Sequence, residues 1–169
     1  NGYIGFCGDI ECMFHCFFVA PEHRDLQRFF WWNENDPSKK LVAYRANVHV
    51  FGHRSSPAVA MHGLHHAASA EISKLYSSAS KFILQNFYVD DALSAADDVQ
   101  EAVETLKNAR KILGSFNMRL HKLSSNCKDV LKAFPDSERA QIHTEIDLNF
   151  SPTQRTLGIV WNTVSDEFI

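Results

Sequence analysis

Short β-forming segments and helical segments follow one another in this chain without a regular alternation, and this order predicts an α+β fold whose antiparallel sheet carries helices on one face. Residues 3–10, 41–51, 118–122 and 156–161 have the composition or the period-2 pattern of strands, and residues 82–94 are predicted to form a strand–turn–strand. Residues 29–32 and 41–51 are expected to form a hairpin.

Two helices are predicted from their start signals. One begins near Pro57, with Ser56 as its candidate N-cap. The other runs from about Val99 to Leu113, where Asp98 and the acid three residues later resemble a capping box and the following glycine is a typical stop.

The composition is that of a globular protein. The 169 residues are 45% hydrophobic and 22% charged, which supports one domain over 1–169 and excludes disordered and collagen-like classes. The net charge of −3 argues against a general nucleic-acid binder, so any phosphate partner must be contacted locally. No apolar run reaches the roughly 18 residues that a membrane span needs, and we expect no membrane partner.

Three aspartates stand at the ends of predicted strands. Asp9 closes the first strand, and Asp90 and Asp91 occupy the tip of the strand–turn–strand. Carboxylates without a His or Cys companion form an oxygen site suited to Mg²⁺ or Mn²⁺, and two such ions support phosphoryl transfer. Taken alone, however, two adjacent acids are more commonly an exposed turn.

Two other clusters contain residue types that commonly bind zinc. The spacing of Cys7, Cys12, His15 and Cys16 does not match the usual paired ligands of a zinc site, and reduced thiols are the preferred interpretation. The three histidines within residues 62–66 lack the glutamate of a metalloprotease motif, so packed or exposed histidines are favoured.

Five ordered sequence blocks resemble the successive palm motifs of reverse transcriptases. They are Asp9-Ile10-Glu11-Cys12-Met13-Phe14, residues 51–58 (FGHRSSPA), Tyr88-Val89-Asp90-Asp91, residues 119–122 (RLHK) and residues 157–161 (LGIVW). Residues 28–32 (RFFWW), 49–52 (HVFG) and 120–126 (LHKLSSN) resemble the Pao/BEL class of long-terminal-repeat retrotransposons. The resemblance spans nearly the whole chain and implies a polymerase palm.

The resemblance implies a site that binds two Mg²⁺ or Mn²⁺ ions. Asp9 and Asp90 would ligate the metals, Asp91 would complete the acidic triad, and the Ile10 carbonyl would be a backbone ligand. Lys122 matches a lysine placed near the pyrophosphate leaving group, where an ammonium supplies a proton or a charge.

The resemblance also assigns residues to the substrates, which would be deoxynucleoside triphosphates and an RNA or DNA template with a DNA primer. Phe14 would reject a 2′-hydroxyl by steric contact, although a core aromatic is the alternative. The expected nucleotide-binding residues are Phe14, Phe51, Gly52, Arg54 and Ser56, and the expected primer-binding residues are Tyr88, Leu157, Gly158 and Trp161. For Trp161 the alternative is sheet packing, and for Arg54 it is an ordinary exposed arginine.

The same resemblance predicts that fingers, thumb and ribonuclease H regions lie outside 1–169, in other regions of the same polyprotein, and that the protein is cytoplasmic and held in virus-like particles. An aspartic peptidase is not indicated, since neither Asp-Thr-Gly nor Asp-Ser-Gly occurs. The alternative function is a catalytically inactive palm remnant that at most binds nucleic acid.

Overall fold

The computed structural model describes residues 4–140, 153–156 and 159–168. The chain divides into two compact units, one made of Asn1–Glu11 and His62–Ile169 and the other of Cys12–Met61. None of the described helices is long and apolar enough to cross a membrane.

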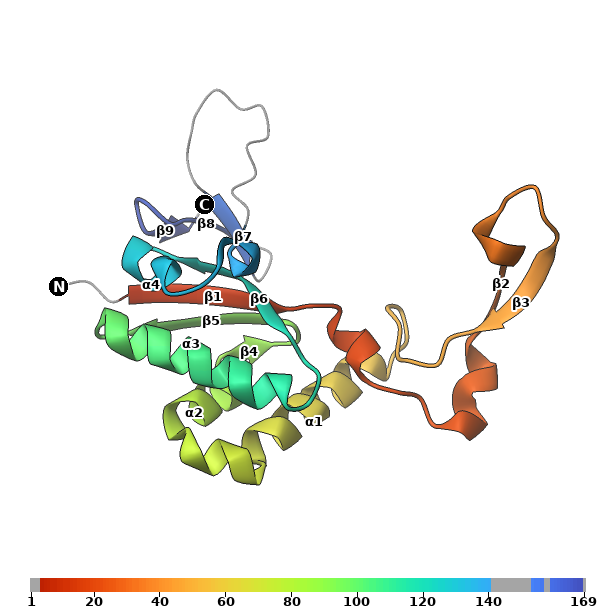
Figure 1. The fold of residues 1–169 in the computed structure, drawn as a ribbon, viewed down its shortest axis with the longest axis horizontal. Helices are drawn as coiled ribbons and strands as arrows, with labels where there is room; N and C mark the ends of the chain where they lie inside the picture. Colours follow the sequence, from red (N-terminus) through yellow and green to blue (C-terminus); the bar gives the residue numbers. More distant parts are fainter. Residues whose placement is uncertain (1–3, 141–152, 157–158, 169) are drawn as a thin grey trace. The chain divides into compact units, whose positions relative to one another are not determined.

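The first unit is organised around a four-stranded antiparallel sheet (Figure 1). Its strands lie in the order β4 (Phe87–Tyr88), β5 (Asp91–Ala96), β1 (Ile4–Ile10) and β6 (Leu120–Ser125). The central strand β1 pairs with β5 on one side and with β6 on the other. An antiparallel sheet in a mixed α+β unit is what the order of sequence segments predicts.

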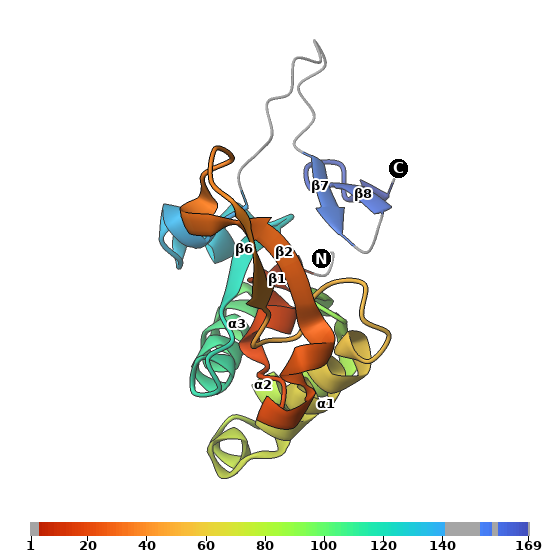
Figure 2. The same cartoon turned by 90° about the vertical axis from the view of Figure 1, so that its right-hand side faces the viewer.

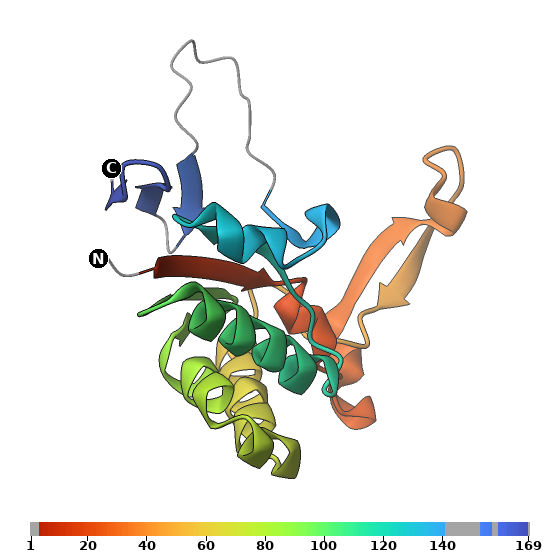
Figure 3. The same cartoon turned by 60° about the vertical axis from the view of Figure 1, so that its left-hand side comes forward.

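Helices cover one face of this sheet, as expected. Figure 3 shows α2 (Ser77–Gln85) and α3 (Val99–Gly114) side by side beneath β1. The rings of Phe6 on β1 and Phe82 on α2 lie 5.7 Å apart, which identifies the helix-facing side of the strand. The buried stripe of α3 consists of Ala102, Thr105, Leu106, Ala109, Ile112 and Leu113. The remaining helices are α1 (Ser56–Ser69) and the short α4 (Lys128–Lys132).

The prediction that Asp98 caps α3 is confirmed, although the reciprocal bond of Glu101 reaches Asp97, one residue before the cap. The Asp98 side chain accepts a hydrogen bond from the Glu101 backbone N–H at 2.8 Å, and the Glu101 carboxylate accepts one from the Asp97 N–H at 3.1 Å. The helix ends at Gly114. The acidic cap at the start and the glycine at the end therefore locate this helix correctly.

The other face of the sheet meets a second, three-stranded sheet of β7 (Thr153–Thr156), β8 (Ile159–Asn162) and β9 (Glu167–Phe168). Trp161 is buried, and its ring approaches Gly5 so closely that a β-carbon there would lie 3.0 Å from the indole. Glycine at position 5 thus permits the close contact between the two sheets.

The second unit contains a hairpin, visible in orange in Figure 2. Strand β2 (Arg28–Trp32) pairs with β3 (Leu41–Arg45), so the predicted hairpin is confirmed, although the second strand ends at Arg45 and not at Phe51. The short 3₁₀ segments of this unit are Met13–Cys16, Pro21–Gln27 and Asn33–Asn35; the first unit adds Glu71–Leu75 and Asp136–Glu138.

Two local predictions are wrong. Residues 82–89 are not one strand, because Ser77–Gln85 is the helix α2, in which Ala79, Phe82 and Ile83 are buried at helical spacing. Ser56 does not cap α1 through its side chain; its hydroxyl instead donates a hydrogen bond to the Val50 carbonyl at 2.9 Å.

Candidate functional site

Two of the three candidate carboxylates face each other across neighbouring strands. Asp9 near the end of β1 and Asp91 at the start of β5 are direct cross-strand partners. They share the side of β1 opposite to the buried, helix-facing residues Phe6 and Ile10. The prediction that the first strand and the aspartate hairpin are neighbours in one antiparallel sheet is confirmed.

The third carboxylate belongs to the turn between β4 and β5. The backbone carbonyl of Asp90 accepts a hydrogen bond from the Ile10 N–H at 2.9 Å, which ties this turn to the end of β1. Val89, which precedes it, has a φ of 57°. A β-branched residue in the left-handed region is strained, and such strain gathers at functional sites.

A β-bulge shapes the neighbouring strand. Cys7 pairs with Ser124 and Asp9 pairs with His121, so Gly8 on β1 stands opposite two residues of β6, Lys122 and Leu123. Lys122 has a φ of 48°, in the left-handed region. Bulges redirect side chains and are over-represented beside active sites.

The bulge brings two consecutive side chains to one carboxylate. The Lys122 ammonium lies 2.5 Å from Oδ2 of Asp9, and His121 Nε2 lies 3.8 Å from the same oxygen. In a regular strand, residues 121 and 122 would face opposite sides of the sheet. His121 Nε2 is buried and has no hydrogen-bond partner among the described residues.

All three aspartates act on the same ammonium. The hydrogen bond to Asp9 raises the pKa of Lys122, partial burial opposes this, and the negative charges of Asp9, Asp91 and Asp90 raise it further. Lys122 is therefore a fully charged cation at neutral pH, held among the carboxylates.

The donor set fits a hard divalent cation in its chemistry, since carboxylate oxygens are what Mg²⁺ and Mn²⁺ prefer. Asp9 and Asp91 supply these oxygens from adjacent strands, and Asp90 lies one residue before the second. Within residues 4–140, 153–156 and 159–168, however, no group of three or more His, Cys, Asp or Glu side chains is already gathered as a metal cage. The ammonium of Lys122 is instead the cation in contact with Asp9.

An ion-pair network that sequence reasoning missed lies next to this site. Arg119 donates to Glu11 at 2.8 Å and to Glu138 at 3.2 Å, and Glu138 also pairs with Arg110 at 3.1 Å. The hydrogen bond from Arg119 lowers the pKa of Glu11. The missed partner of Asp9, His121, had one signal in the sequence: Gly8, because an isolated glycine in a strand often marks a bulge.

The expected nucleotide-binding residues lie in the second unit. The rings of Phe14, which is buried, and Phe51, which is exposed, meet edge to face with centroids 4.7 Å apart. Gly52 has a φ of 88°, which favours glycine, and Arg54 is exposed. Ser56 is buried, and its hydroxyl lies 3.3 Å from His49 Nδ1 in addition to its bond to Val50.

The expected primer-binding residues differ in their surroundings. Tyr88 is exposed on β4. Trp161 is buried, stacks on Phe168 and donates its indole N–H to Asp166 at 3.1 Å, in addition to its contact with Gly5, so sheet packing describes its surroundings. Leu157 and Gly158 lie outside the described residues.

No protein-family model matches this chain, and no curated protein matches it either.

Proposed function

We propose that the chain is the palm region of an RNA-directed DNA polymerase of a retrotransposon, which transfers nucleotides to the 3′-hydroxyl of a DNA primer on an RNA or DNA template. The observation that carries the proposal is the cross-strand pairing of Asp9 with Asp91, two residues that lie over 80 positions apart in the sequence. The turn that contains Asp90 is bonded to the end of the same strand, through the Ile10 N–H. The five ordered sequence blocks support the same function.

The carboxylates of Asp9, Asp90 and Asp91 are the groups that would hold Mg²⁺ or Mn²⁺, which when bound activates the attacking oxygen and neutralises the phosphoryl group. Lys122, beside these carboxylates, supplies a positive charge to the leaving pyrophosphate. The hydrogen bond from the Ile10 N–H to the Asp90 carbonyl holds this turn against the end of β1. Both atoms belong to the backbone, so this bond does not involve the Asp90 carboxylate. Most of such catalysis is positioning and electrostatic stabilisation.

In the second unit, Phe14 is proposed to select deoxyribose sugars. Its edge-to-face contact with Phe51 restricts the motion of the ring, and a fixed ring is what steric rejection of a 2′-hydroxyl requires. Gly52, Arg54 and Ser56 follow in the same segment and are proposed to shape the nucleotide pocket. In a polymerase containing this chain, Phe14→Ala is expected to admit ribonucleotides while sparing deoxynucleotide incorporation.

One observation favours the alternative of an inactive remnant. Asp9 is engaged by Lys122, which neutralises a carboxylate that catalysis needs for metal. If this pair outlasts the addition of divalent ions, the chain binds nucleic acid at most. Metal binding therefore separates the two functions.

The test has two measurements on the 169-residue chain. Calorimetry is expected to show Mn²⁺ binding that is lost in Asp9→Asn and Asp91→Asn, because each substitution removes a charged ligand. Primer extension with Mg²⁺, four deoxynucleotides and a primed RNA template is expected to be slow, since the net charge of −3 attracts the template weakly. That extension should vanish in Asp90→Asn.

The matched control is Asp97→Asn, which removes an equal charge from an exposed position before α3. It should retain both metal binding and extension. Wild-type Mn²⁺ affinity in Asp9→Asn and Asp91→Asn would contradict the proposed site. Metal binding without any extension, even at saturating template, would favour the remnant.

A further inference from the structure

A cavity of about 550 Å³ lies in the first unit at the C-terminal part of α3. Its lining comes from the last two turns of the helix and from the turn that leads into β6. The lining residues are Lys107, Arg110, Lys111, Gly114, Asn117, Met118, Arg119 and Leu120. Four of these eight residues are cations and none is an acid, in a chain whose net charge is −3.

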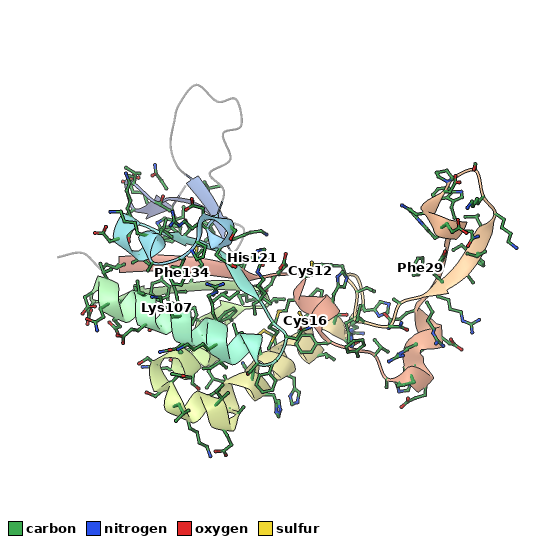
Figure 4. All side chains as sticks on the ribbon, in the orientation of Figure 1. Cys12, Cys16, Phe29, Lys107, His121 and Phe134 are labelled. Atoms are coloured by element: carbon green, nitrogen blue, oxygen red, sulfur yellow. The ribbon has the colours of Figure 1, made fainter. Side chains whose placement is uncertain are left out.

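Contacts outside the cavity hold three of the four cations in place. The guanidinium carbon of Arg110 lies 5.8 Å from the centre of the Phe134 ring, and Lys111 Nζ lies 5.3 Å from that of Tyr76. Arg119 is held by Glu11 and Glu138. Figure 4 labels the fourth cation, Lys107, on α3. Side chains that are already ordered lose less conformational entropy when a ligand binds.

The charges around the cavity are not balanced by the described residues. Glu11 and Glu138 are the carboxylates that pair with Arg119 and Arg110, and Lys107 and Lys111 form no ion pair in the part of the chain that the structure describes. Two positive charges thus remain in excess, which matches the charge of a phosphate dianion.

This cationic arrangement has a cost for the helix. Lys107 and Lys111 are four residues apart on one helix face, and like charges at this spacing destabilise a helix. The cations do complement the negative end of the helix dipole. That effect is confined to the last turn and does not require Lys107 or Arg119.

We propose that this cavity binds a phosphate-bearing ligand, with Lys107, Arg110, Lys111 and Arg119 contacting the phosphate oxygens. Clustered cations around a cavity of this volume suit phosphate groups of a free pyrophosphate or nucleotide, or of a nucleic-acid backbone. The cavity is lined from the helix side of the sheet, and its residues include none of the three aspartates. The proposal therefore does not depend on the polymerase function.

Gly114 offers a direct test, because a β-carbon at this position would meet no atom within 4 Å. A side chain can be added there without a clash at its first carbon. Gly114→Glu places a negative charge at the cavity, and Gly114→Gln adds the same volume without charge. A unit charge about 4 Å away is worth about 1 kcal/mol in water, or about fivefold in affinity.

The experiment titrates the chain with sodium pyrophosphate in EDTA, which keeps divalent metal away from the aspartates, and follows backbone amide shifts by NMR. We expect shifts in residues 107–120 and binding weakened at least about fivefold in Gly114→Glu and Lys107→Glu. Gly114→Gln, Asp9→Asn and Lys81→Glu, the last an equal charge change on α2, should retain binding. A parallel titration with a single-stranded RNA identifies the source of the phosphate.

Competition by RNA at the same residues would assign the site to a nucleic-acid backbone, and binding of pyrophosphate alone would assign it to small phosphates. Absence of binding of both probes would overturn the proposal. So would equal weakening by Lys81→Glu, because only overall charge would then matter. If Lys107→Glu changes thermal stability but not binding, Lys107 serves only the stability of the helix and the proposal is wrong.

Discussion

The Nζ atom of Lys122 lies 2.5 Å from Oδ2 of Asp9, so a residue of the chain itself supplies the cation at the candidate metal ligand. Both side chains are partly exposed, and such pairs contribute about 0.2–1 kcal/mol. The larger consequence concerns metal binding, because an incoming ion and the ammonium compete for one oxygen.

Lys122→Met is therefore expected to raise the affinity of the chain for Mn²⁺ about thirtyfold, the effect of removing one unit charge about 4 Å from a divalent ion in water. Without metal, its melting temperature should fall slightly. Calorimetry and thermal unfolding measure the two effects. Lys128→Met, which removes the same charge from an exposed position on α4, should leave the affinity unchanged; a similar gain in both variants would argue against direct competition.

Val89 is expected to be replaceable with a gain in stability. A left-handed conformation costs a residue with a β-carbon about 1–2 kcal/mol, and the flexibility of glycine in the unfolded chain offsets about 0.5–1 kcal/mol of the gain. Val89→Gly should thus stabilise the chain by up to about 1.5 kcal/mol in urea denaturation. Val89→Ile, which keeps the β-branch, serves as the control and should bring no gain. A loss of stability in Val89→Gly would show that the turn is not strained.

Gly8 and Gly114 are expected to respond in opposite directions to alanine. A β-carbon at Gly8 would lie 3.0 Å from the ends of both Leu120 and Leu123, which are buried, so Gly8→Ala should destabilise by about 1–3 kcal/mol. Gly114→Ala meets no atom and should stabilise α3 by about 0.5–1 kcal/mol. Denaturant unfolding compares them, and equal effects at the two positions would contradict this packing.

Helices and strands could be predicted wherever their sequence signals are local. Asp98 and Glu101 specify the start of α3 through their own hydrogen bonds, and β1 is a short apolar run. The segment around Phe82 is predicted as a strand because its residues favour strands, whereas its burial against the sheet follows a helical spacing. Propensity was overridden by tertiary packing.

The candidate site was predictable only in part for a related reason. The alignment of Asp9 with Asp91 follows from one strand with an acid near its end and a neighbouring antiparallel strand that begins with an acid, and the sequence blocks indicate both positions. The arrival of His121 and Lys122 at one carboxylate depends on an extra residue in β6. Period-2 reasoning assumes a regular strand and assigns these two side chains to opposite faces.

Cys7 is expected to resist thiol reagents. Burial, with the negative charge of Asp91, raises the pKa of its thiol from 9.0 to about 12, while Cys12 is exposed. Because the pKa of Cys7 is higher in the folded than in the unfolded chain, the protonated thiol contributes to the free energy of unfolding. This contribution is complete below pH 9 and is lost as the pH rises towards 12. Iodoacetamide at pH 8 should label Cys12 far faster than Cys7, as peptide mass spectrometry measures; comparable rates would mean that the strand opens readily.

Cys7→Ala provides the control for the alkaline effect. Without this thiol, the decline of stability between pH 9 and pH 11 should be smaller than in the wild type, as measured by urea denaturation at each pH. An unchanged decline would assign it to other groups.

The bulge in β6 also makes the chain tolerant of a length change at one position. On either side of the bulge, Cys7 pairs with Ser124 and Asp9 pairs with His121. If β6 had one residue fewer opposite Gly8, both pairs would belong to one regular antiparallel register. Deleting Lys122 would therefore convert β6 into a regular strand and leave every flanking pair in place. In the evolution of such a sheet, the cation beside Asp9 can be gained or lost by the insertion or deletion of a single codon, while the remaining residues of β6 keep their pairing partners on β1.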